Sequence, residues 1–166
     1  MNLSKIKKLQ QGFTLIELLV VIGILAVLLA ITLIAINPAH QFAQANNTKR
    51  RSDILQILNA IGQYTAENKG NLPADVVDLV DSTPTAFNST NFSAICADLI
   101  SGTPAYIPAF PTDPSLNVND IDITACNDQV ATPWDTGYTV ERDNTSGRIT
   151  VAAPNADEGV AIDVTR

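Results

Sequence analysis

The chain has 166 residues and a net charge of −7 at pH 7, so it is long enough for one small domain and an additional segment. The charge is uneven, because the part after Arg51 carries four basic residues against sixteen acidic ones. Such an acidic surface repels phosphate backbones, so nucleic acid is not expected as a partner for the bulk of this part.

No set of residues in the sequence forms a recognisable catalytic group. The chain has a single histidine, His40, and no glycine-rich phosphate loop or metal-binding His/Cys spacing. The serines and threonines lack a candidate base. We therefore expect a protein that is not an enzyme and that has no organic cofactor.

The first elements in chain order are a lysine-bearing leader and an apolar run. Lys5, Lys7 and Lys8 precede a stretch from Leu18 to Ile36 that carries no formal charge. A run of about 20 such residues is long enough to cross a bilayer as a helix. The lysines before it predict a cytoplasmic N-terminus and a head outside the membrane. Glu17, at the start of the run, places a costly carboxylate near lipid and so predicts a contact between molecules.

The junction of leader and run reads Gln11-Gly12-Phe13-Thr14-Leu15-Ile16-Glu17. It closely resembles the prepilin signature of type IV pilins and pseudopilins. The resemblance implies that prepilin peptidase cleaves between Gly12 and Phe13 and that the new amino group of Phe13 is methylated. It also implies that Glu17 faces the terminal amine of Phe13 in a neighbouring copy, within a helical filament.

The same resemblance implies how the protein is inserted in the membrane and assembled, and what its function is. The precursor would be a single-pass membrane protein among lipids, which an inner-membrane assembly platform adds to a filament on the cell surface. The expected function is the structural subunit of a type IV pilus, serving adhesion, motility or DNA uptake. Two alternatives remain: a pseudopilin of a type II secretion system, and a membrane-tethered binding module that uses only the anchor.

The resemblance also implies an α+β pilin fold, in which a long helix packs against a small antiparallel sheet with a loop-rich C-terminal region. We expect a leader at 1–12, an apolar filament-core helix at 13–36, its amphipathic continuation at 37–69 and a globular head at 70–166. Pro38 removes a backbone hydrogen bond and predicts a kink or a local loss of helix. The helical stripe of the second half is Ile54, Ile57, Leu58, Ile61 and Thr65, and the basic run 49–51 is expected on an exposed, charged face of the helix.

The rest of the chain predicts short elements between loops. Residues 73–80 and 92–100 are expected to form short helices, the first with Asp75 near its start and the second capped by Ser93. Alternating apolar residues predict a hairpin of 138–142 and 148–152, with a third strand near 160–164. Trp134 and Tyr138 are expected in the core.

Two candidate sites lie in the head. Cys96 and Cys126 are the two cysteines of the chain, and an exported head permits a disulfide between them. The alternative is two unrelated buried thiols. The pieces 110–114 and 133–138 loosely resemble a calcium-binding stretch of secretion pseudopilins, here divided by residues 115–132. Either the acidic residues of this region bind calcium or they form a solvated loop; they are Asp113, Asp120, Asp122, Asp128 and Asp135.

Overall fold

The computed structural model describes residues 12–116 and 134–166 and comprises two compact units, Met1–Gln41 and Phe42–Arg166. The described part of the first unit is dominated by α1 (Leu15–Ile36), which is apolar on all sides and has no buried residue. By length and composition, α1 is the one helix among the described residues that could cross a membrane. The predicted apolar helix is therefore present, and its surface is free for contacts with lipid or protein.

The helix predicted over 13–69 is present but interrupted at one residue. Asn37 adopts a left-handed backbone conformation (φ 45°, ψ 79°), and α2 (Pro38–Glu67) begins immediately after it. Proline disfavours helical geometry in the residue before it and is well suited to the first position of a helix. Asparagine tolerates the left-handed region better than most residues. Pro38 thus has the predicted helix-breaking effect, with the break located at Asn37.

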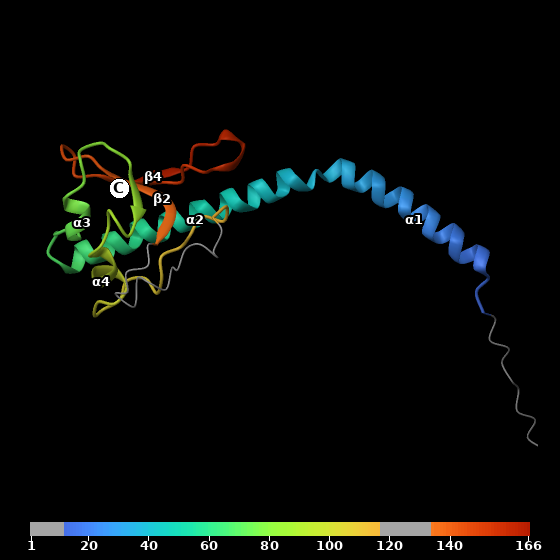
Figure 1. The fold of residues 1–166 in the computed structure, drawn as a ribbon, viewed down its shortest axis with the longest axis horizontal. Helices are drawn as coiled ribbons and strands as arrows, with labels where there is room; N and C mark the ends of the chain where they lie inside the picture. The colour runs from blue at the N-terminus through green and yellow to red at the C-terminus, as the bar shows by residue number, and fades with distance from the viewer. Residues whose placement is uncertain (1–11, 117–133) are drawn as a thin grey trace, which may run out of the picture. The chain divides into compact units, whose positions relative to one another are not determined.

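The core of the second unit lies between α2 and a four-stranded antiparallel sheet (Figure 1). The strands β1 (Thr85–Asn88), β2 (Asp135–Arg142), β3 (Ile149–Ala152) and β4 (Asp163–Thr165) are arranged in sequence order. The predicted hairpin is confirmed as β2 and β3, and the third strand as β4. β1 falls in a region where loops and short elements were expected, with no strand assigned to residues 85–88.

The predicted stripe of α2 is confirmed for its four apolar members, which are buried against the core; they are Ile54, Ile57, Leu58 and Ile61. Thr65, the last member of the predicted stripe, is only half-buried. Trp134 and Tyr138 are buried too, as expected. Trp134 joins a cluster of rings in which Phe87 makes edge-to-face contacts with Phe92 and Phe110. These aromatic contacts close the end of the core where β2 begins.

Three short helices connect these parts: α3 (Ala74–Val77), α4 (Ile95–Leu99) and the 3₁₀ turn η1 (Asp157–Gly159). The predicted cap of α4 is wrong, because Ser93 makes no cap bond and Ala94 occupies the cap position. Instead, Asp75 of α3 accepts hydrogen bonds from the backbone N–H groups of Ala94 and Ile95, at 2.7 and 2.8 Å. A carboxylate from another helix thus satisfies the free donors at the start of α4.

Candidate functional site

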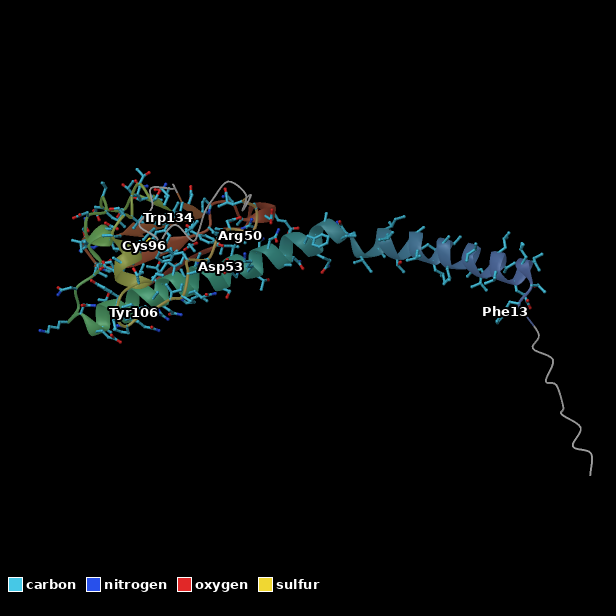
Figure 2. All side chains as sticks on the ribbon, turned by 60° about the horizontal axis from the view of Figure 1, so that its bottom comes forward. Phe13, Arg50, Asp53, Cys96, Tyr106 and Trp134 are labelled. Carbon is cyan, nitrogen blue, oxygen red and sulfur yellow. The ribbon has the colours of Figure 1, made fainter. Side chains whose placement is uncertain are left out.

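The segment before α1 contains the residues expected to be processed and to assemble. Phe13 is 85% exposed, and it precedes the helix at the end of the described chain (Figure 2). A Cβ built on Gly12 meets no atom within 4 Å, and the backbone there is not left-handed. The described chain therefore gives no steric reason of its own for glycine at this position. A demand for a very small residue would have to come from another molecule.

Thr14 and Glu17 form a capping box at the start of α1. The Thr14 hydroxyl accepts a bond from the Glu17 backbone N–H at 3.3 Å, while the backbone N–H of Thr14 donates to Glu17 Oε2 at 2.8 Å. The Thr14 hydroxyl also donates to Oε2, at 2.6 Å. This arrangement satisfies donors that a helix start leaves open, and it directs the carboxylate toward the N-terminal end of the helix.

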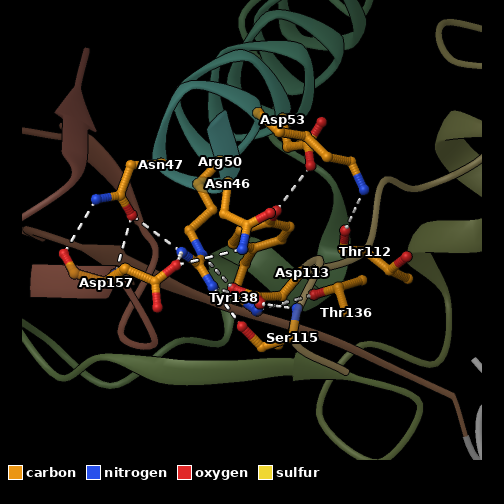
Figure 3. Close-up of polar contacts among 12 residues, drawn as sticks. Asn46, Asn47, Arg50, Asp53, Thr112, Asp113, Ser115, Thr136, Tyr138 and Asp157 are labelled. Atoms are coloured by element: carbon orange, nitrogen blue, oxygen red, sulfur yellow. Dashed lines mark hydrogen bonds and ion pairs between the residues drawn. The ribbon is translucent and has the colours of Figure 1, made fainter. Parts of the chain in front are cut away.

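A second polar cluster, which was not predicted from the sequence, lies in the head around Arg50 (Figure 3). The basic run 49–51 was expected on an exposed face, and for Arg50 that prediction is wrong, since its side chain is 0% exposed. Its guanidinium contacts the carboxylates of Asp113 and Asp157, each at 2.8 Å. The helical spacing in the sequence could have indicated this burial, because Arg50 precedes Ile54 and Ile57 by four and seven positions and so lies on the same face of the helix.

The ionisation of these groups reflects their contacts. Burial acts to raise the pKa of Asp113, but hydrogen bonds from Arg50 and Ser115 outweigh it, so this pKa lies below the usual value. The hydrogen bond from Arg50 also lowers the pKa of Asp157. The bond to Asp113 in turn raises the pKa of Arg50. All three groups are therefore charged at neutral pH.

A buried carboxylate–phenol pair lies beside this cluster. The hydroxyl of Tyr138 on β2 donates to Asp53 of α2 at 2.7 Å. Burial raises the pKa of Asp53, and burial together with that carboxylate raises the pKa of Tyr138. The pair links β2 of the sheet to α2 through a buried polar contact.

Of the five acidic residues considered for calcium, the structure describes Asp113 and Asp135. Both oxygens of Asp113 already accept bonds from Arg50, and Asp135 Oδ1 accepts one from the N–H of Gly137 at 2.8 Å. Within residues 12–116 and 134–166, no group of three or more His, Cys, Asp or Glu is placed to hold a metal. Asp120, Asp122 and Asp128 lie outside the described residues, so the calcium site stays a prediction.

The segments 110–114 and 134–138, from the two pieces that together resemble the calcium-binding stretch of secretion pseudopilins, are in contact in the structure. The backbone N–H of Asp113 donates to the carbonyl of Thr136 at 2.8 Å. Gly137 has a left-handed φ of 77°, and a Cβ there would lie 2.8 Å from the Cβ of Asp113. Glycine at 137 is thus required both by its backbone conformation and by the close approach of the segment before residue 117.

Cys96 lies in α4 and is 8% exposed, and the described residues contain no free cysteine (Figure 2). Its expected partner, Cys126, lies outside the described residues. The Cys96–Cys126 pairing therefore stays a prediction.

Comparison with known proteins gives one finding at the N-terminus. Residues 7–33 match the family model described as the prokaryotic N-terminal methylation motif. The match covers Gly12, Phe13 and Glu17 together with most of α1. Neither the curated proteins nor the solved structures gave a match to the chain.

Proposed function

We propose that the chain is the structural subunit of a type IV pilus, because residues 7–33 match the prokaryotic N-terminal methylation motif, which is the prepilin signature of type IV pilins and pseudopilins. The family is a structural one, whose members are processed and assemble into filaments, and not an enzyme family. The observation that carries the proposal is Glu17, a single carboxylate at the start of a helix whose apolar side chains are exposed on every face.

Processing would begin with hydrolysis of the peptide bond between Gly12 and Phe13 by prepilin peptidase. The reaction leaves a carboxylate on Gly12 and a new amine on Phe13. Methylation of that amine keeps its positive charge while adding apolar surface. The capping box is unaffected by the cut, because it uses only atoms of Thr14 and Glu17.

Assembly would then bury the exposed surface of α1 among the same helices of other copies. The large side chains at its start are 58 to 85% exposed, so their burial supplies most of the attraction; they are Phe13, Leu15, Ile16, Leu18 and Leu19. A carboxylate in that environment is strongly unfavourable unless an opposite charge meets it. The Phe13 amine of a neighbour supplies this charge and fixes the axial position of each copy.

Before assembly the precursor would lie in the inner membrane among lipids, with its leader in the cytoplasm and its head outside. The three leader lysines favour this orientation. An assembly platform in the same membrane would transfer the processed subunit to the growing filament. The expected roles on the cell surface are adhesion, motility or DNA uptake, and nucleic acid is not expected to bind most of the acidic head.

A pseudopilin of a type II secretion system is the second candidate. The bond between Asp113 and Thr136 favours it, because it joins the two pieces that resemble the secretion pseudopilin stretch. Against it stands the long insertion between these pieces, residues 115–132, which separates them in sequence.

Electron microscopy of negatively stained cells, with an antibody raised against the head, separates the two functions. A pilus subunit predicts long labelled filaments on wild-type cells and none on cells lacking the gene. A secretion pseudopilin at native expression predicts no labelled surface filaments, together with exoproteins retained in the periplasm when the gene is deleted. The second pattern would reject the pilus assignment.

A further inference from the structure

Arg50 is a fully buried cation whose hydrogen bonds account for all of its donors. Nε donates to Asp113 Oδ2 at 2.8 Å, and Nη2 donates to Asp113 Oδ1 at 3.1 Å and to Ser115 Oγ at 2.5 Å. Nη1 donates to Asn47 Oδ1 at 2.9 Å and to Asp157 Oδ2 at 2.8 Å. A guanidinium has five N–H donors, so each one has its own acceptor.

The acceptors come from three segments that are distant in sequence. Asn47 lies on α2 itself, Asp113 and Ser115 precede β2, and Asp157 follows β3 in η1 (Figure 3). Arg50 therefore joins the helix to both segments that flank the β2–β3 hairpin.

The acceptors are also held in place by bonds that do not involve Arg50. Asn47 accepts from the backbone N–H of Asp157 at 2.9 Å and donates to its carbonyl at 3.0 Å. Asp113 Oδ1 accepts from the backbone N–H of Ser115 at 2.8 Å, and the N–H of Asp113 donates to Thr136. Asn47 and the backbone of Asp157 thus hold each other in place, and Asp113 is held by Ser115 and Thr136, by bonds that are independent of Arg50.

We propose that Asn47, Asp113, Ser115 and Asp157 form a preorganised guanidinium cage, which Arg50 of the same chain fills. The cage fixes segments 113–115 and 157–159 on the surface of α2. Its two carboxylates are countered by one guanidinium, so removing the Arg50 side chain leaves a site with excess negative charge and room for a small cation. The inference concerns the head alone and does not depend on the filament proposal.

The distribution of acceptors favours a planar guanidinium over a spherical ion. The two oxygens of Asp113 bind two different nitrogens, as in a bidentate arginine–carboxylate pair, and the remaining acceptors bind the outer nitrogens. Calcium would need six to eight oxygens converging at about 2.3–2.6 Å on one point. Here the acceptors are spread over three nitrogens.

Two other charged side chains near the cage, Lys49 and Asp53, both lie on α2. Lys49 is tied to the carbonyl of Thr112 at 3.1 Å, and Asp53 is tied to Tyr138. Neither is hydrogen-bonded to Arg50 in the structure. We therefore expect neither to substitute for the missing guanidinium.

The test is chemical rescue of Arg50→Ala, in the full-length chain in detergent micelles. Unfolding is followed through Trp134, the single tryptophan of the chain, which is 6% exposed. Loss of the buried cation should lower the unfolding temperature on the order of 10 °C. Guanidinium chloride, far below denaturing concentration, should restore part of this loss, because it binds the folded state. Equal ionic strength of sodium chloride should restore none.

Arg51→Ala is the matched control, because Arg51 is the exposed neighbour on the same helix. It should unfold near the wild-type temperature and show no gain from guanidinium. Arg50→Lys keeps the positive charge but loses the planar guanidinium with its five donors. This variant should therefore remain destabilised, and guanidinium should not restore its stability. Wild-type stability of Arg50→Ala would overturn the proposal. So would calcium rescuing that variant as well as guanidinium does.

Asp157→Asn provides a second route if Arg50→Ala does not fold. Asp157 is at the edge of the cage with its side chain 36% exposed, so its loss leaves Asp113 to hold Arg50. Hydrogen exchange should become at least several-fold faster in residues 157–159, while the fluorescence of Trp134 stays that of the wild type. Unchanged exchange in this segment would contradict the proposed role of the cage.

Discussion

The carboxylate of Glu17 is bound by Thr14, three positions before it, through both the backbone N–H at 2.8 Å and the side-chain hydroxyl at 2.6 Å. The residue assigned to filament pairing thus has a second task within its own helix. A glutamine could perform this second task, because capping boxes accept Glu or Gln at this position. Charge and capping can therefore be separated by mutation.

Glu17→Gln should leave the precursor processed but reduce filament yield by at least about tenfold, because the neutral amide keeps the cap and cannot neutralise a buried amine. Filaments sheared from cells and measured by immunoblot give the yield, and the mass of the membrane-bound subunit shows whether the leader has been removed. Thr14→Ala is the control. It keeps the charge and weakens the cap by about 1 kcal/mol, so filaments should still form. Normal yield in Glu17→Gln would refute the pairing role.

Replacing Gly12 by valine should block removal of the leader. No described atom lies within 4 Å of a Cβ at this position, so the substitution does not disturb the folded chain. An effect on processing would then come from the peptidase. The intact mass should retain residues 1–12 in Gly12→Val and lose them in Gly12→Ala, since alanine is the smallest change available. A correctly trimmed Gly12→Val chain would argue against recognition of glycine at the junction.

The pairing of Cys96 with Cys126 predicts that the exported protein has no thiol accessible to maleimide, even when unfolded, until it is reduced. Cys126→Ser should leave Cys96 as a thiol that reacts once the chain is unfolded. Loss of a disulfide that closes a loop of this length typically costs about 2–4 kcal/mol, so this variant should also unfold at lower temperature. Labelling of the unreduced, unfolded wild-type chain would indicate two separate thiols.

The features that could be predicted from the sequence are those that depend on hydrophobic periodicity and on turn residues. The stripe of Ile54 and Ile57 follows the helical repeat, and the β2–β3 hairpin follows strict alternation around a turn at Asp143. The Asp143 carboxylate accepts bonds from the N–H groups of Thr145 and Ser146, at 2.8 and 3.0 Å. Such signals are local, so no knowledge of distant contacts is needed to interpret them.

The features that the sequence did not reveal depend on contacts between distant segments. Helical spacing places Arg50 on the buried face of α2, but the partners that permit a buried charge, Asp113 and Asp157, come from positions far along the chain. Likewise, the cap of α4 comes from Asp75 rather than from a residue beside the helix. Hydrogen bonds from the folded environment override the local preference for exposed charge and for a serine cap.

The stability of the head should fall in acid, and the contacts of Arg50 contribute to this loss. Asp113 and Asp157 have pKa values below those of the unfolded chain, so their contribution is complete above about pH 5 and is lost as pH falls through the lowered values. Asp53 acts in the opposite direction, because burial raises its pKa and its protonation in mild acid relieves an unfavourable buried charge. Urea unfolding between pH 7 and pH 3 measures the combined effect.

Asp157→Asn tests this assignment, because it removes one acid-sensitive charge and keeps the size of the side chain. It should be less stable than wild type at pH 7, and the difference should shrink as pH falls, since the wild-type carboxylate is then protonated as well. Asp163→Asn, on the exposed edge strand β4, is the matched control and should follow the wild-type curve. A difference between wild type and Asp157→Asn that stays constant down to pH 3 would show that the ion pair does not carry the acid dependence.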